Sequence, residues 1–177
     1  FEIVHRYEKA LQLVGEEVRE GNPSPGNKAG GITTLEEKSL GCIHKGGHTP
    51  VNAVYDYAKQ VEAHQGLVIM DTPGNDPSSV AAMVAGGAQV IVFSSGRGTP
   101  TGNPLAPVIK ITGNRITFAK MEDNIDVDAS PIIYGGDLKK LGDDFMKLVS
   151  EVASGRQTKA EALGFTEMAI ARVCNFV

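Results

Sequence analysis

Apolar residues recur at helical spacing near both ends of the chain. In the opening segment, charged residues fill the positions between them, which predicts an amphipathic helix that ends at Gly21. The apolar positions of this helix are Ile3, Tyr7, Leu11, Val14 and Val18. A similar repeat over residues 138–152 predicts a closing helix that stops near Gly155, and we expect one or two shorter helices between residues 159 and 172.

Two further helices are predicted from their start signals. Thr33 and Thr34 each have a glutamate three residues later, which is the capping-box spacing, so a helix should run from there to about Lys45. Thr49 and Pro50 resemble an N-cap and a first helical residue, and an apolar stripe follows them. That stripe, formed by Val51, Val54, Tyr55, Ala58 and Val61, predicts a third helix.

Short apolar runs predict the strands. Residues 66–70 and 88–93 are two buried-strand patterns separated by a small-residue helix around 78–85, which gives a β-loop-α unit. If these strands are parallel neighbours, the loops that follow them lie at one edge of the sheet. Residues 107–112 and 115–120 flank Gly113-Asn114, a two-residue hairpin signal that would make the sheet mixed, and residues 126–128 form a loop or short strand.

This order of elements predicts one α/β domain over residues 1–177. We expect a Rossmann-like or flavodoxin-like layered fold with a mainly parallel sheet and flanking helices. The chain has 177 residues, of which 41% are hydrophobic and 21% charged, enough for a substantial core.

Composition narrows the classes of protein. The net charge of −4 and the lack of a basic block argue against a general nucleic-acid binder. The apolar runs are strand-sized, so no membrane span is expected. Cys42 and Cys174 offer neither a metal-knuckle spacing nor a disulfide framework, which fits a reduced cytoplasm. The oligomeric state is left open, including a homo-oligomer.

A glycine-rich, cationic loop precedes the helix predicted from Thr34. Two prolines stiffen residues 22–31, three glycines let a ligand approach the backbone, and Lys28 adds a mobile charge beside the amides of Asn22 and Asn27. Because helix N-termini attract anions, this loop is a candidate site for a carboxylate or phosphate. The alternative is a tight connection whose glycines only satisfy the backbone.

Two more polar loops follow the predicted strands. Arg97 stands between glycines in residues 94–102 and has the donor geometry for a carboxylate, while neighbouring hydroxyls suit a polyol. Asp71 comes directly after a strand and is a candidate base or metal ligand, or alternatively a turn residue. The glycine spacings miss those of nucleotide-binding loops, so an ATP-type site is the weaker interpretation.

Histidines and aspartates give no firm metal site. His44 and His48 converge only if their helix breaks at Gly46. Asp126 and Asp128 share one side of a strand and suit a hard cation, but strand-end aspartates are commonly solvated. No metal ligand is named from these residues.

Four segments of the chain resemble the altronate/galactarate dehydratase family. They are Asn22–Gly41, Asp71–Asp76, Ser94–Pro100 and Asp126–Ala129, in the family's order. The resemblance implies the carboxyl-terminal domain of a longer hydro-lyase, whose amino-terminal SAF-type region would be a partner. It implies dehydration of a sugar acid such as altronate to a 2-keto-3-deoxy acid, with help from a divalent ion, Fe²⁺ or Mn²⁺. Similar motifs occur in lyases that eliminate sulfite from sulfolactate.

The resemblance also suggests roles for the loop residues. Lys28 and Arg97 would bind or polarise the substrate carboxylate, and Asp71 is the candidate for acid–base or metal duty. The expected substrate-binding residues are Asn22, Ser24, Asn27, Gly30, Ser95, Gly96 and Thr99. The alternatives are a non-catalytic anion-binding or assembly domain, and a sulfolactate-type lyase subunit.

Overall fold

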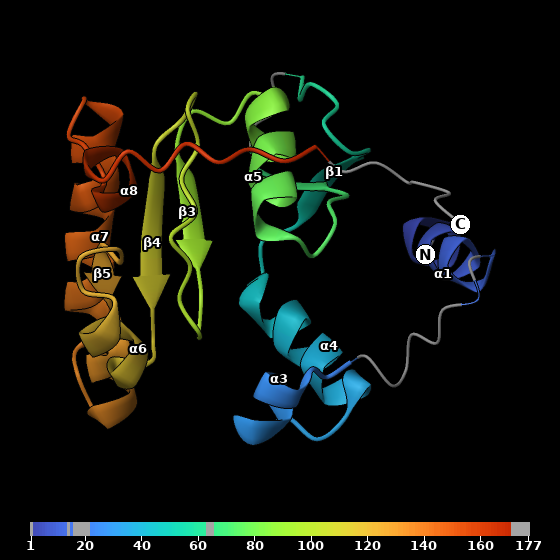
Figure 1. The fold of residues 1–177 in the computed structure, drawn as a ribbon, viewed down its shortest axis with the longest axis horizontal. Coiled ribbons are helices and arrows are strands. Elements are labelled where there is room, and N and C mark those ends of the chain that lie inside the picture. The colour runs from blue at the N-terminus through green and yellow to red at the C-terminus, as the bar shows by residue number, and fades with distance from the viewer. Residues whose placement is uncertain (1, 14, 16–21, 63–65, 171–177) are drawn as a thin grey trace. The chain divides into compact units, whose positions relative to one another are not determined.

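The computed structural model describes residues 2–13, 15, 22–62 and 66–170 (Figure 1). Two compact units divide the described chain, and each is considered by itself. Unit 1 comprises the described residues of 1–54 and 64–69, and unit 2 comprises those of 55–63 and 70–172. The single domain over residues 1–177 stays a prediction. Within the described part, no helix has the length and apolar character needed to cross a membrane.

Among its described residues, unit 1 has three helices and most of a small sheet. The helices are α1 (Glu2–Leu13), α3 (Pro25–Ala29) and α4 (Leu35–Lys45), and strand β1 (Val51–Tyr55) pairs with β2 (Leu67–Met70). The unit division falls within both strands, at Val54 and Ile69. Large apolar side chains of α4 are exposed, Leu40 at 58% and Ile43 at 71%, so this helix has little burial among the described residues.

Unit 2 is built around a three-stranded parallel sheet in the order β3-β4-β5. Its elements are α5 (Asp76–Ala85), β3 (Ile91–Ser94), β4 (Val108–Thr112), α6 (Arg115–Lys120), β5 (Val127–Asp128), the 3₁₀ helix η1 (Ser130–Tyr134), α7 (Leu138–Ala153) and α8 (Lys159–Ala162). Figure 1 shows the strands between α5 on one side and α7 on the other. The α/β class with parallel strands and flanking helices is therefore confirmed.

The buried core of unit 2 lies where α5 meets the sheet. Val80 of α5, Ile91 of β3 and Val108 of β4 are almost fully buried and pack together, with Met83 and Phe93 against them. Burying an aliphatic side chain of this size stabilises a fold by about 1.5–3 kcal/mol. This core fixes β3 and β4, and the polar loop that contains Arg97 leaves the carboxyl end of β3.

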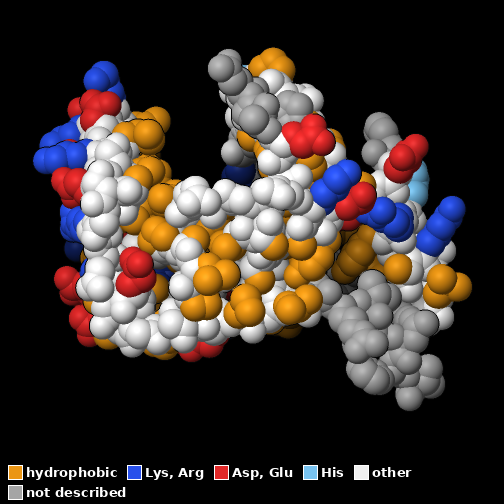
Figure 2. Space-filling model, turned by 90° about the horizontal axis from the view of Figure 1, so that it is seen from above, with side chains coloured by type: hydrophobic (Ala, Val, Ile, Leu, Met, Phe, Trp, Pro, Cys, Tyr) orange, Lys and Arg blue, Asp and Glu red, His pale blue; other side chains and the backbone are white. Residues whose placement is uncertain are grey.

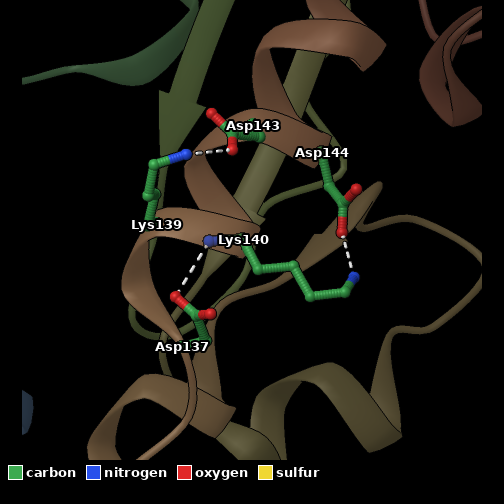
Figure 3. A network of polar contacts seen from close by, with 5 residues as sticks. All are labelled: Asp137, Lys139, Lys140, Asp143 and Asp144. Carbon is green, nitrogen blue, oxygen red and sulfur yellow. Dashed lines mark hydrogen bonds and ion pairs between the residues drawn. The ribbon is translucent and has the colours of Figure 1, made fainter.

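Helix α7 begins at the N-cap Asp137, whose side chain accepts a hydrogen bond from the Lys140 N–H at 3.0 Å. On its exposed face, Lys139 pairs with Asp143 at 2.9 Å and Lys140 with Asp144 at 2.6 Å (Figure 3). The hydrogen bond from Lys140 to Asp144, together with the charge of Asp144, raises the pKa of Lys140. Because both pairs are exposed to solvent, they add little to the stability of the helix.

The prediction of a helix after Thr49 is wrong. Residues 51–55 form β1, which pairs with β2. The segment contains two valines and a tyrosine, which are residue types that suit a pleated strand. Over so short a stretch, the spacing of its apolar residues fits a helix as well as a strand. Ala58, which was expected within that helix, has a left-handed φ of +57° that no α-helix contains.

The prediction of a hairpin at Gly113-Asn114 is also wrong. Asn114 is the N-cap of α6, and its Oδ1 accepts from the N–H groups of Ile116 at 3.0 Å and Thr117 at 3.2 Å. Because side-chain capping replaces the turn, the chain continues as a helix and returns to pair β5 parallel to β4. The three-stranded sheet is therefore wholly parallel rather than mixed.

The predicted pairing of the strands at 66–70 and 88–93 is not observed. β2 pairs with β1, whereas β3 pairs with β4. The prediction assumed that consecutive strands are neighbours, but β1, which was taken for a helix, is the partner of β2. The other predicted elements, α4, α5, β2 to β5, α7 and α8, are present within a few residues of their expected bounds. Helix α1 covers the first part of the predicted opening helix, whose positions Val14, Val18 and Gly21 lie outside the described residues.

Candidate functional site

The loop in unit 1 is held by bonds between near neighbours. Ser24 Oγ donates to Asn27 Oδ1 at 2.9 Å, and Pro25 begins the five-residue helix α3. Lys38 of α4 donates from Nζ to Asn22 Oδ1 at 2.9 Å. Gly30 ends α3, and its N–H donates to the Gly26 carbonyl at 3.1 Å. The amide oxygens of Asn22 and Asn27 are therefore already engaged by protein donors.

Lys28 is the exposed cation of this loop. Its ammonium makes no hydrogen bond or ion pair with the residues that the structure describes. A mobile, unpaired ammonium on a short loop can accept an anionic ligand without first breaking an internal contact.

The N-terminus of α4 already holds a carboxylate of the chain itself. Thr34 is the N-cap and accepts from the Glu37 N–H at 3.1 Å, while Glu37 Oε2 accepts from both the N–H and the hydroxyl of Thr33 at 2.7 Å. The backbone and side-chain hydrogen bonds from Thr33 lower the pKa of Glu37. The predicted N-cap Thr34 is thus present, but Glu37 returns its hydrogen bonds to Thr33, one residue before the N-cap, so the capping box is only half formed. A ligand anion at this helix end would compete with Glu37.

In unit 2, the loop of residues 94–103 leaves the carboxyl end of β3. Two hydrogen bonds fix its first half: Ser95 Oγ accepts from the Gly98 N–H at 2.9 Å, and Thr117 Oγ1 donates to the Gly96 carbonyl at 2.8 Å. Arg97 lies between them, is exposed, and has no partner among the described residues. Gly98 has a φ of +83°, a backbone conformation that favours glycine, and a Cβ there would lie 2.2 Å from Met121 Sδ, so the methionine side chain would have to move.

The second half of this loop is buried. Thr99 and Thr101 share a hydrogen bond of 2.7 Å between their hydroxyls, and both side chains are buried. Asn103 Oδ1 accepts from the Leu105 N–H at 2.9 Å, whereas its Nδ2 has no partner among the described residues. Asn103 also lines an apolar cavity of about 240 Å³ beneath Met168.

Asp71 directly follows β2 and is half-buried. Its N–H donates to the Tyr55 carbonyl at 2.8 Å, which extends the contact between β1 and β2 by one residue. The sequence therefore placed Asp71 correctly at a strand end, and its acid–base role stays a prediction.

Lys110 and Thr117, which both bond to this loop, were not foreseen. Lys110, in the centre of β4, is only 1% exposed, and its Nζ donates to the carbonyls of Thr101 at 3.2 Å and Pro100 at 3.4 Å. Burial lowers its pKa, an effect that the charges of Asp126 and Glu167 partly oppose. The signal was available, because a lysine within the apolar run of residues 108–111 is unusual for a buried strand.

The aspartates considered for a cation serve as backbone acceptors. Asp126 accepts from the N–H groups of Lys110 at 2.7 Å and Lys159 at 2.9 Å, and Asp128 accepts from that of Ser130 at 2.8 Å. Across the described residues, no three or more His, Cys, Asp and Glu side chains gather in a way that could hold a metal ion. The divalent ion implied by the resemblance therefore stays a prediction.

Several large apolar side chains of unit 2 are exposed. They include Leu105, Leu163, Met168 and Ile170. Figure 2 shows apolar side chains in patches on the face it views, with most charged side chains toward the margins.

Taken together, the parallel sheet and the glycine- and hydroxyl-rich loop at its carboxyl edge define an α/β domain suited to binding a small polar ligand. Residues 1–175 match the model of the family described as D-galactarate/altronate dehydratase, C-terminal. The chain belongs to this family, as the four sequence segments implied.

Similar proteins agree with this family. Over 84% of its length the chain is 44% identical to altronate dehydratase of Escherichia coli and 40% identical to that of Bacillus subtilis. It is also 37% identical, over 89% of its length, to the (2R)-sulfolactate sulfo-lyase subunit beta of Chromohalobacter salexigens. The chain spans 30% of each altronate dehydratase and 41% of the sulfo-lyase subunit.

Proposed function

We propose that this chain supplies part of the substrate site of a sugar-acid dehydratase, with altronate as the first substrate to test. The observation that carries the proposal is Arg97, an exposed guanidinium with no described partner, held between two fixed glycines in a chain of the dehydratase family. The identity to the altronate dehydratases, 40–44%, exceeds the 34% to galactarate dehydratase of Escherichia coli, which favours altronate.

In the proposed reaction, Arg97 holds the substrate carboxylate, and Lys28 of unit 1 is a separate candidate for the same role. A base removes the proton from C2, and the electron pair moves into the carboxylate to give an aci-carboxylate, whose charge the bound cation stabilises. The C3 hydroxyl then leaves with a proton as water, and the enol tautomerises to the 2-keto-3-deoxy acid. Asp71 is the proposed base or acid.

The loop side chains would orient the remaining hydroxyls. Ser95, Gly96 and Thr99 are proposed for this role in unit 2, and Asn22, Ser24, Asn27 and Gly30 in unit 1. Ser95 and Thr99 already bond within the loop, so a substrate hydroxyl would share or replace those bonds.

The divalent ion, Fe²⁺ or Mn²⁺, is proposed to bind mainly to other parts of the intact enzyme, including an amino-terminal SAF-type region. This fits a chain that spans 30% of its dehydratase relatives and whose described residues form no cluster of metal ligands. A cytoplasmic location stays a prediction.

The test is Arg97→Gln in the intact enzyme, assayed with altronate. Loss of a charge-assisted hydrogen bond of about 1.5–3 kcal/mol should lower kcat/KM by about 10- to 150-fold. Arg115→Gln is the matched control, because Arg115 is also exposed but lies on α6. Equal activity of the two variants would contradict the proposal.

A sulfolactate lyase is the second candidate. It is favoured by the 37% identity to a sulfo-lyase subunit. The chain covers 41% of that subunit but 30% of each altronate dehydratase. Both substrates offer a carboxylate beside an acidic C–H bond. Turnover of sulfolactate but not of altronate by the intact enzyme would select this candidate while leaving the role of Arg97 unchanged.

A further inference from the structure

Lys110 is a buried cation in the middle of a parallel strand. Its neighbours in β4, Ile109 and Val108, are also fully buried, and among the fully buried side chains Lys110 is the largest. An apolar side chain would fill this space without removing a charge from water. The lysine therefore needs a role that packing alone does not explain.

Its ammonium binds the loop that carries Arg97. The two acceptors, the carbonyls of Pro100 and Thr101, lie three and four residues after Arg97. On the other side of Arg97, the Gly96 carbonyl accepts from Thr117 of α6. The loop is thus fastened at both ends of Arg97, to β4 and to α6, while Arg97 itself remains exposed.

The charges around Lys110 come from three elements. Asp126 precedes β5, Lys159 begins α8, and Glu167 lies in the segment after α8. Asp126 accepts from the backbone N–H groups of both Lys110 and Lys159, which ties β4 to α8. Lys110 thus belongs to a network of hydrogen bonds. Its ammonium binds carbonyls of the loop, and the carboxylate of Asp126 binds backbone N–H groups.

We propose that Lys110 is a positioning residue that fixes the Pro100–Thr101 segment and thereby holds Arg97 in the orientation that binds the substrate carboxylate. This inference rests on the proposed function, because it assigns the purpose of the fixed loop to that carboxylate. Lys110 does not touch the substrate and acts through Arg97.

The experiment uses Lys110→Met in the intact enzyme, since methionine fills much the same space without donors. Hydrogen exchange is measured for the amides of residues 94–103, with residues 76–85 of α5 as an internal reference. We expect exchange in the loop to accelerate at least about tenfold with α5 unchanged. The KM for altronate should rise about tenfold, more than kcat falls, because carboxylate binding is loosened.

Lys120→Met is the matched control, since Lys120 is an exposed lysine on α6, and it should leave both readouts unchanged. If Lys110→Met does not fold, Lys110→Gln replaces it, because the shorter amide keeps a donor but does not reach both carbonyls. Wild-type exchange in the loop of the folded variant would overturn the proposal.

The kinetic measurements on Lys110→Met and Arg97→Gln separate this inference from the proposed function. Accelerated loop exchange with a raised KM supports the proposal. The proposal is overturned if Lys110→Met accelerates exchange but leaves KM unchanged while Arg97→Gln is impaired. In that case Arg97 binds the substrate without needing Lys110. If Arg97→Gln is fully active as well, the failure lies with the proposed function.

Discussion

The two polar loops have similar compositions but are supported in different ways. The loop of residues 22–34 is held by bonds within itself and to α4, and its polar side chains are exposed or half-buried. The loop of residues 94–103 is anchored by contacts to β4 and α6 and places Thr99, Thr101 and Asn103 in the interior. The second loop therefore shares the stability of the core of unit 2, whereas the first depends on local bonds.

This difference bears on function. A catalytic or binding group is most effective when its surroundings are fixed before the substrate arrives. Arg97 meets that condition, because its flanking residues are fastened to two elements. Lys28 lies on a five-residue helix and is suited to follow a ligand rather than to preset its position.

The largest expected difference between the loops is their tolerance of an added methyl group. In Gly102→Ala, the Cβ would lie 2.1 Å from the Phe165 carbonyl oxygen, so the backbone must shift, and we expect a loss of about 2–3 kcal/mol. In Gly30→Ala, the nearest atom is 3.4 Å away, so the change should cost less than about 0.5 kcal/mol. Urea unfolding midpoints measure both, and equal effects would contradict the distinction.

A smaller difference should follow from removing one hydroxyl in each loop. Thr101→Val deletes the buried partner of Thr99 and should destabilise the protein by about 1–2 kcal/mol. Ser24→Ala removes a half-buried bond to Asn27 and should cost about 0.5 kcal/mol. Thermal denaturation of the two variants compares them; a larger loss from Ser24→Ala would show that the first loop is the more tightly built.

The smallest effect concerns Glu37, which is exposed. The pKa of Glu37 is lower in the folded protein than its ordinary value of 4.5. The ionised carboxylate therefore stabilises the fold above pH 4.5, and this stabilisation is lost as the pH falls through the folded-state pKa. In Thr33→Val, the hydroxyl donor is missing while the N–H remains, so the pKa should move part of the way back toward 4.5. Carboxyl carbon NMR titration measures this, and an unchanged pKa would mean that the hydroxyl contributes nothing.

Much of the fold could be predicted from local signals. The continuous apolar runs at 66–70 and 107–112 contain strands, as predicted, and the repeat over 138–152 is long enough for its helical period to be unambiguous. The start of α4 at the N-cap Thr34 was also predicted correctly from spacing alone. Residues 51–55 and 115–120 were misassigned because each is too short for its period to decide between helix and strand.

The site could be predicted only in part. The sequence Gly-Arg-Gly at residues 96–98 indicated that the loop of residues 94–103 is a candidate site. The predicted strand before it indicated where this loop begins. The support from Lys110 and Thr117 depends on contacts across 9 to 21 residues, which the sequence does not display. Their roles follow from the parallel pairing of β3 and β4 and from the capped helix α6, both of which required the structure.

The most direct test of the carboxylate site is hydrogen exchange of the intact enzyme with and without saturating altronate. The account predicts that altronate slows exchange in residues 94–103, with a separate decrease in residues 22–34 if Lys28 also binds the carboxylate. Altronate bound at saturation with no change in either segment would contradict the claim that these loops hold the substrate.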